Sequence, residues 1–453
     1  NAKMFRILQP QALQAGNIGF TWNPAAGSPQ IHALRIHRGS RVIDVLEQTS
    51  FEVLRREDQL EMAVLDGLLT ATLQVPDLRV GDDLEIEFTL PTNDPTLGAT
   101  SSGLLAIADA PPEGRFRIEL QWEDGQKPTT RITDDFAEDA RMTDGAIAVS
   151  YDNPPTLIPP RDAPARFVWN RVIEFSDFDS WSAVSRRFDS LFRDAATLAP
   201  DSPLREEAAI IAETHSDDLA RAQAALKLVQ QQVRYVFVGL NGGNYTPASA
   251  DETWQRRYGD CKGKTAMLLA LLAELGIEAE PVLVNNSISS DGFDMRLPNP
   301  GLFDHVIVRA RIDGEDYWFD GTMPPVIKAA RRPFFGYKWV LPLAQAGKDI
   351  ERLPDRPFDL PQEMGMMEID ARAGFDEPAR VVYTTVTRGG AALQEYLQFT
   401  SVSASQLESA LIGQLSGSPT WDEVEKVDYR FDRETQASIL TITGTGPVDW
   451  EDY

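Results

Sequence analysis

Cys261 is the side chain whose type and position best suit covalent chemistry. It follows Asp260, a residue type common at helix N-caps, and precedes an apolar run that begins at Ala266. The first turn of a helix favours a thiolate, the reactive form of cysteine, through its unsatisfied N–H groups and positive dipole end. Further positive charge near the thiol comes from four basic residues: Arg256, Arg257, Lys262 and Lys264. The alternative is a small buried hydrophobic residue, as most free cysteines are. The late start of the apolar run fits that alternative less well.

His305 and Asp320 are predicted to share one face of a β-hairpin. Residues 305–312 alternate as a strand, and Asp313-Gly314 is a typical two-residue hairpin turn before the returning strand. In this register Ile307 lies opposite Asp320, so His305 and Asp320 are diagonal neighbours within side-chain reach. We therefore predict His305 as the base for the thiol and Asp320 as the group that orients the base.

Other interpretations of the same segments carry less weight. Asp304 would face the other side of the hairpin, and Asp316 lies too far along its strand. A lone histidine can also be a packed or solvated residue, and Asp320 can simply end a strand. The heptapeptide at 259–265 resembles a phosphate-binding loop, but only three residues separate its glycines where that loop needs four. No buried strand precedes it either, so a nucleotide site is not predicted.

Three motifs together resemble the transglutaminase-like superfamily. They are Tyr258-Gly259-Asp260-Cys261-Lys262-Gly263-Lys264, Phe303-Asp304-His305-Val306 and Tyr317-Trp318-Phe319-Asp320-Gly321-Thr322. More closely, the chain is similar to bacterial proteins in which a β-rich domain of unknown function precedes this core. Segments that carry that similarity are Leu65-Asp66-Gly67 through Val80-Gly81-Asp82, and Asn93-Asp94-Pro95. Gly263 departs from the pattern, because such proteins more often carry an acidic residue there.

The resemblance implies a thiol-dependent acyl-transfer enzyme with the triad Cys261, His305 and Asp320. The thiolate would attack a peptide or protein amide and form a thioester, which water or an amine then resolves. Water makes a peptidase or amidase, and an amine makes a transglutaminase. We expect the Cys261 N–H and one upstream donor, Asn244 or Tyr245, to bind the oxyanion. The rival class is a non-catalytic exported binding or scaffold protein that keeps the core as a folding unit.

The elements around these residues predict an α+β protein. Alternation over residues 84–90 and 116–122 indicates strands with one buried face, and short turns separate such runs through the first third of the chain. After a proline-rich stretch the period becomes helical, notably near residues 206–215 and 218–232. We therefore predict three regions: a β-sandwich at 1–160, a papain/transglutaminase-like core at 161–330, and a mixed, partly β region at 331–453. Within the last region, residues 379–387 and 437–443 resemble strands, and 393–399 and 405–415 resemble helices.

Composition narrows the range of partners. The 453 residues include 43 Lys plus Arg and 69 Asp plus Glu, a net charge of −26 that repels nucleic acid. With one cysteine the chain can form no internal disulfide, and the four histidines do not cluster at metal-ligand spacing. We predict no metal, no cofactor and no integral membrane segment, and a peptide or protein as substrate.

The ends of the sequence bear on localisation. No signal peptide opens the chain, but Asn1-Ala2 resembles the remnant of a tag, and the chain stops abruptly after Trp450. We expect the native protein to extend beyond both ends. Because the proteins that the chain resembles are usually exported, we expect an extracytoplasmic location, periplasmic or secreted.

Overall fold

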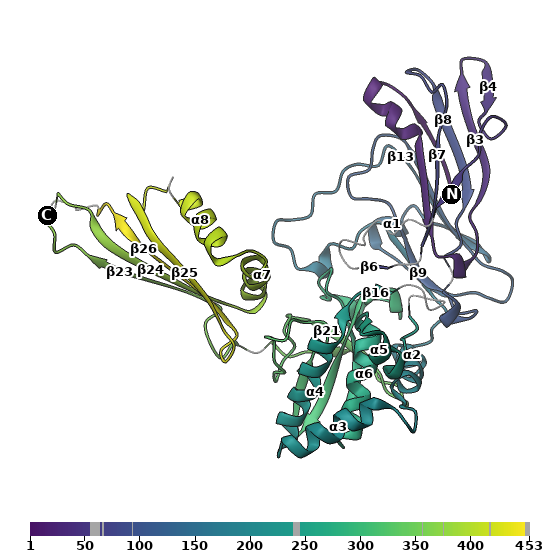
Figure 1. Ribbon diagram of the computed structural model, residues 1–453. Helices are drawn as coiled ribbons and strands as arrows, with labels where there is room; N and C mark the ends of the chain where they lie inside the picture. The colour runs from purple at the N-terminus through teal and green to yellow at the C-terminus, as the bar shows by residue number, and fades with distance from the viewer. Residues whose placement is uncertain are drawn as a thin grey trace. The chain divides into compact units, whose positions relative to one another are not determined.

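The computed structural model describes residues 1–54, 64–65, 68–92, 94–238, 245–355, 357–374, 376–415 and 418–448. The chain forms two compact units. The first consists of Asn1–Thr322 with Trp339–Arg352, and the second of Met323–Lys338 with Leu353–Tyr453. Helices and sheets occur in both, so the predicted α+β class is confirmed (Figure 1). The predicted boundaries near residues 160 and 330 stay predictions, and Asp66, Gly67 and Asn93 lie outside the described residues.

The N-terminal strands build one core from two sheets. The first sheet has the order β1 (Ala2–Arg6), β8 (Asp83–Thr89), β3 (Gln30–Arg38) and β4 (Arg41–Asp44). The second has the order β2 (Asn17–Trp22), β7 (Leu69–Gln74) and β5 (Glu52–Leu54). Phe20 and Leu73 of the second sheet share one buried cluster with Leu34 and Leu84 of the first. The predicted alternation at residues 84–90 is confirmed by β8.

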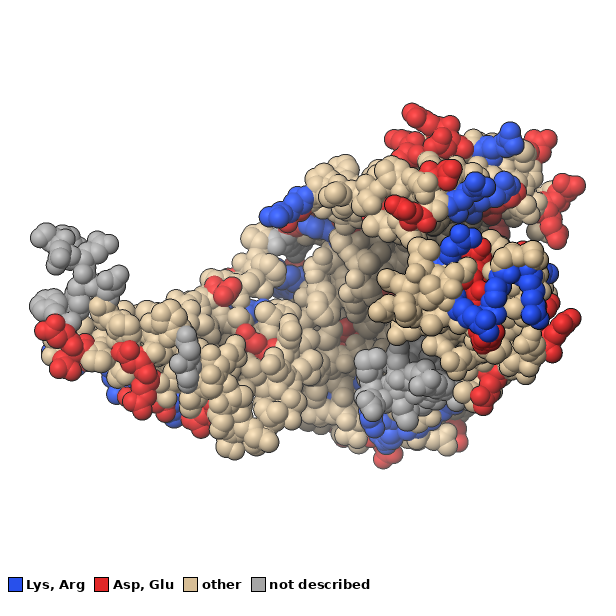
Figure 2. All heavy atoms as spheres, turned by 90° about the horizontal axis from the view of Figure 1, so that it is seen from above, with Lys and Arg blue, Asp and Glu red and all other residues tan. Residues whose placement is uncertain are grey.

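Two further sheets lie between this core and the helices. One has the order β10 (Arg115–Gln121), β13 (Ala146–Asp152) and β12 (Arg141–Met142). The other has the order β11 (Thr129–Ile132), β14 (Val172–Ser176) and β9 (Ser102–Ala106). Phe136 of the short helix α1 (Asp134–Ala137) is fully buried between them with Ile147 and Ile173. Figure 2 shows Lys and Arg side chains in blue and Asp and Glu side chains in red on one face of the molecule.

A five-stranded antiparallel sheet and five helices complete the first unit. The sheet order is β20 (Glu315–Phe319), β19 (His305–Ile312), β18 (Ala279–Val284), β21 (Trp339–Pro342) and β22 (Glu351–Arg352). The helices are α2 (Trp181–Ala196), α3 (Pro203–Thr214), α4 (Asp218–Gln232), α5 (Ala250–Arg256) and α6 (Cys261–Glu274). Helix α6 contacts β18 and β19 on one side and α2, α4 and α5 on others (Figure 1). It is therefore buried almost all round, which explains why its sequence is apolar on every face.

Short elements join these parts. Two parallel pairs form, β15 (Arg234–Tyr235) with β17 (Tyr258–Gly259) and β16 (Phe237–Val238) with β6 (Val64–Leu65). Short 3-10 helices lie at Pro10–Gly16, Pro24–Ala26, Pro95–Leu97, Ala165–Phe167, Phe293–Met295 and Pro300–Leu302. Among the described residues, no helix combines the length and apolarity needed to cross a membrane.

The second unit is a four-stranded antiparallel sheet with two helices. The strand order is β23 (Glu363–Asp370), β24 (Ala379–Arg388), β26 (Ala437–Gly446) and β25 (Glu423–Asp432), and the helices are α7 (Gly389–Thr400) and α8 (Ala404–Leu415). Side chains of α8, including Leu411 and Leu415, pack against Val381 and Ile442 of the sheet. The strands and helices predicted here are confirmed. The sequence gives no signal for β23, whose residues are exposed on both faces and therefore do not alternate.

Candidate active site

Cys261 is the first residue of α6, as predicted. Asp260 has extended backbone angles, φ −83° and ψ −174°, and its Oδ1 accepts a hydrogen bond from the Gly263 N–H at 2.9 Å. This is the geometry of an N-cap, so it places the Cys261 thiol beside the unsatisfied N–H groups of the first turn. A steric constraint explains why residue 263 is glycine, because a Cβ there would lie 2.8 Å from the Thr253 hydroxyl. Close packing of α5 on α6 thus accounts for the absence of an acidic residue at this position.

The hairpin adopts the predicted register. Asp313 and Gly314 both have positive φ, 52° and 79°, which is the two-residue turn of type I′. Ile312 pairs with Glu315 and Val308 with Phe319, so the next step along the ladder brings Asp320 opposite Ile307. His305 Nε2 lies 2.9 Å from Asp320 Oδ2, within the predicted hydrogen-bonding distance. A three-residue turn would have put the two side chains on opposite faces.

Asp320 is held by donors other than the imidazole. Its Oδ1 accepts from the backbone N–H of Thr322 at 2.9 Å and from the Thr322 hydroxyl at 2.6 Å. Gln230 of α4 donates to the Asp320 carbonyl at 3.2 Å. Burial alone would raise the pKa of Asp320. The His305 charge and the hydrogen bonds from His305 and Thr322 lower that pKa below its usual value. Asp320 is therefore an ionised acceptor with a fixed orientation.

His305 is protonated more readily than an ordinary histidine. Burial alone would lower its pKa, but the Asp320 charge and hydrogen bond, with a further hydrogen bond to the Cys261 side chain, raise the pKa of His305 to about 10. The structure thus brings Cys261, His305 and Asp320 together. With Nε2 committed to Asp320, Nδ1 is the ring nitrogen left for the thiol. An imidazolium beside a sulfur atom stabilises the thiolate, the form that attacks carbonyl carbon.

The raised pKa of His305 predicts how stability depends on pH. The stabilisation that protonated His305 gives the folded state is complete below its unfolded-state pKa of 6.5. It is lost as the pH rises towards about 10, by at most about 1.4 kcal/mol per pH unit. Lys264 acts in the opposite direction, because burial lowers its pKa to about 8. The informative quantity is therefore the difference in free energy of unfolding between wild type and His305→Gln. This difference should shrink between those two pH values. A difference that stays constant in urea titrations would contradict the assignment.

Two lysines of α6 play roles that sequence reasoning missed. Lys262 forms an ion pair with Asp260, and the Lys264 ammonium donates to the Val233 carbonyl. Both side chains are buried, at 9% and 2% exposure. The sequence predicts both as local positive charge around the thiol, but the Lys262 charge is compensated by Asp260. Charged residues within an otherwise apolar helix are the signal that could have pointed to buried partners.

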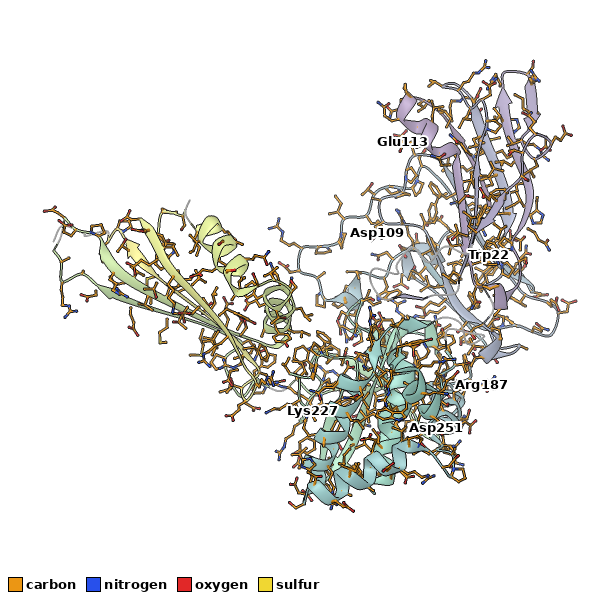
Figure 3. The ribbon with its side chains drawn as sticks, in the orientation of Figure 1. Trp22, Asp109, Glu113, Arg187, Lys227 and Asp251 are labelled. Carbon is orange, nitrogen blue, oxygen red and sulfur yellow. The ribbon has the colours of Figure 1, made fainter. Side chains whose placement is uncertain are left out.

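Cys261 and His305 open into a cavity of about 780 Å³. Aromatic residues of its lining include Phe188, Tyr245 and Phe303. The lining also includes residues 100–104, which belong to β9 and to the segment before it. Arg187 of α2 (Figure 3) links the helix to the segment before β9, because its Nε donates to the Thr96 carbonyl at 3.1 Å. The cavity is therefore shaped jointly by the core and the N-terminal strands.

Tyr245, one predicted oxyanion donor, lines this cavity, whereas Asn244 lies outside the described residues. The Tyr245 ring meets Phe188 edge-on, with centroids 5.1 Å apart. Burial, with a smaller contribution from the Asp94 charge, raises the pKa of Tyr245 to about 12, so its hydroxyl remains a donor at neutral pH. Tyr245→Phe should lower kcat by about tenfold or more while the melting temperature stays near wild type. An unchanged kcat would show that the ring only packs.

The sequence predicts that clusters of metal-ligating side chains are absent from this chain. In the part of the chain that the structure describes, no group of three or more His, Cys, Asp or Glu side chains could hold a metal ion. His32 Nε2 lies 2.8 Å from the Thr89 hydroxyl, and His37 Nε2 lies 2.7 Å from Glu85 Oε2.

One known protein family matches the N-terminal part of the chain. The family model of DUF3857, a domain of unknown function with a solved structure, matches residues 1–151. This agrees with the predicted resemblance of the N-terminal strands to such a domain. No curated protein matches the chain.

Similarity to solved structures extends over more of the chain than the family match does. A putative protease from Parabacteroides distasonis has a TM-score of 0.59 at 11% identity and covers 99% of this chain and 89% of its own. A putative cysteine protease from Cytophaga hutchinsonii has a TM-score of 0.18 at 12% identity, with 73% and 79% coverage. The periplasmic domain of TgpA from Pseudomonas aeruginosa has a TM-score of 0.21 at 15% identity, with 67% and 95% coverage. The first establishes a shared fold over nearly the whole chain, and TM-scores as low as the other two do not.

Proposed function

We propose that this chain is a thiol-dependent acyl-transfer enzyme that acts on peptide or protein amides. Cys261 is the nucleophile, His305 the general base and acid, and Asp320 the group that orients the imidazole. The single observation that carries the proposal is the arrangement itself. A thiol at a helix N-terminus and an imidazole line one cavity and are hydrogen-bonded to each other, and the buried Asp320 carboxylate lies 2.9 Å from the imidazole. Each of these features raises the reactivity of the thiol.

The proposed reaction uses these groups twice. The Cys261 thiol gives its proton to His305 Nδ1, and the sulfur attacks the amide carbonyl. The C–N bond breaks as the imidazolium returns that proton to the leaving amine, which leaves a thioester on Cys261. A water molecule or a primary amine, deprotonated by His305, then attacks the thioester and releases the thiol. Asp320 holds the imidazole tautomer throughout and remains ionised.

The negative oxygen of each tetrahedral intermediate needs donors near Cys261. The backbone N–H of Cys261 is one of the free donors at the start of α6. The Tyr245 hydroxyl in the same cavity is the proposed second donor.

We favour hydrolysis over transamidation as the outcome. Water is abundant, and excluding it from a thioester demands a purpose-built acceptor channel. A peptidase or amidase is therefore the first candidate, and a transglutaminase activity is the alternative outcome of the same thioester.

The proposal includes the finer architecture and the location. The two-sheet core of the N-terminal strands supports a β-sandwich, and α6 against an antiparallel sheet supports a papain/transglutaminase-like core. An extracytoplasmic location fits the resemblance drawn from the sequence. A lone cysteine suits an oxidising compartment, because it has no partner for an internal disulfide.

The test is product identification by mass spectrometry. Wild type and Cys261→Ala are incubated with a glutamine-containing peptide, with and without a primary amine. Cleaved or deamidated peptide from wild type alone supports hydrolysis, and efficient amine incorporation supports transamidation. No turnover of a broad set of peptides, with Cys261 unreactive, would favour the non-catalytic binding or scaffold role instead.

A further inference from the structure

We propose that β9 binds the substrate as an added β-strand, so that the enzyme acts on an extended, unfolded segment of polypeptide. This inference rests on the proposed function, because it names the substrate class of the same site. Strand β9 is the edge strand of its sheet, in the order β11, β14, β9. It also forms one wall of the cavity that holds Cys261 and His305.

The free edge of β9 follows from its pairing with β14. Ile107 N donates to Arg171 O at 3.2 Å, and Asp177 N donates to Ser101 O at 2.8 Å. Pairing in an antiparallel ladder alternates, so residues 101, 103, 105 and 107 turn their backbone groups towards β14. Ser102, Leu104 and Ala106 turn theirs outward. In the part of the chain that the structure describes, no backbone group bonds to those outward N–H and C=O groups.

An edge strand with unpaired backbone groups is a template for another strand. Proteins usually protect such edges with charge or proline, but the sequence of β9 is Ser-Gly-Leu-Leu-Ala and carries neither. Leu104 is 41% exposed, which leaves an apolar contact beside the open groups. The unpaired backbone groups of β9 and the exposed Leu104 side chain therefore suit the binding of an extended peptide.

The chain near β9 leads directly to the catalytic groups. The Ser102 hydroxyl donates to Asn299 Oδ1 at 3.2 Å, and Asn299 begins the turn Pro300–Leu302. Three residues after Leu302 comes His305, and all of these residues line the same cavity. A peptide paired with β9 would thus run along the lining of the cavity that holds Cys261 and His305. A segment in a helix or in the interior of a sheet cannot enter this way, because its backbone groups are already paired, so the site favours an extended, unfolded segment.

Binding to a catalytically inactive chain separates this proposal from turnover. The probe is a fluorescein-labelled peptide of alternating valine and threonine around one central glutamine, measured by fluorescence anisotropy against full-length Cys261→Ala. Each peptide N–H is methylated in turn. In a paired strand only every second N–H bonds to β9, so methylation should weaken binding by about tenfold or more at alternate positions and little between them. A uniform effect along the peptide would overturn the proposal.

Leu104 offers a matched pair of variants in the same Cys261→Ala background. Leu104→Pro removes the outward N–H without touching the ladder to β14, and proline is tolerated at strand edges. Leu104→Ala keeps that N–H. We expect the proline variant to lose about tenfold in affinity and the alanine variant to stay within about threefold. Equal binding by both folded variants would contradict strand addition, and the methylation series decides if the proline variant does not fold.

The two proposals fail in different ways. Alternating methylation effects with no turnover by wild type would support peptide binding at the edge of β9 and contradict the proposed enzymatic function. Turnover by wild type with uniform methylation effects would support the enzymatic function and contradict strand addition at β9.

Discussion

Replacement of Cys261 by alanine is expected to reduce acyl transfer by a factor on the order of 10⁴ or more. The reason is that the thioester can form on no other side chain, since the chain holds a single cysteine. Alanine removes only the sulfur from a buried position at the start of α6, and it leaves the Asp260 cap intact. The melting temperature should therefore change by a few degrees at most. The measurement is kcat/KM on the peptide that wild type turns over, with far-UV circular dichroism as the folding control.

Cys261→Ser sharpens this prediction. It keeps a hydroxyl of similar size at the same place, but that hydroxyl is far harder to deprotonate than a thiol. We expect it to be nearly as inactive as Cys261→Ala and to bind the peptide as well as that variant does. Activity within tenfold of wild type in either variant would show that the reaction does not proceed through a thioester on Cys261.

Asp320→Asn should leave a folded enzyme whose kcat falls by a factor on the order of 10⁴. An asparagine amide can donate its N–H to His305 Nε2, which would put the imidazole proton on Nδ1, the nitrogen that must accept the thiol proton. The pKa of His305 should also fall, because the Asp320 charge that raises it is lost. The expected signature is low kcat at every pH, with the apparent pKa of the base shifted downwards.

Thr322→Val is the matched control for Asp320. It removes the hydroxyl that donates to Asp320 Oδ1 at 2.6 Å, but the backbone N–H of residue 322 keeps its bond at 2.9 Å. The carboxylate keeps its charge and one of its two restraints on Oδ1. We expect kcat to fall by no more than about tenfold. Equal losses for Asp320→Asn and Thr322→Val would mean that Asp320 has a structural role rather than an electrostatic one.

The candidate triad could be predicted from sequence because local rules place each member. The Asp260 cap fixes the start of α6, and the two positive-φ residues Asp313 and Gly314 fix the hairpin register. That register then decides which aspartate faces His305. None of these steps needs information from distant parts of the chain.

The surroundings of the triad could not be predicted in the same way. The ion pair of Lys262, the Lys264 contact with Val233 and the Gln230 contact with the Asp320 carbonyl all depend on how helices pack. Hydrophobic periodicity does not encode such packing. The wall that β9 contributes to the cavity joins residues more than 150 positions apart in sequence, which no local pattern predicts. Strand β23 was missed for a different reason, since exposure on both faces removes alternation.

Alkylation of Cys261 by iodoacetamide as a function of pH tests the central claim most directly. An ordinary thiol has a pKa near 8.5 and reacts slowly at about pH 5.5. A thiolate held by protonated His305 should be alkylated quickly at that pH, and His305→Gln should slow the reaction by about tenfold or more. Mass spectrometry of the digested chain locates the adduct. Rapid, His305-dependent modification at acid pH is the result that the account predicts. A rate that rises only near the pKa of ordinary thiols, and that His305→Gln leaves unchanged, would contradict it.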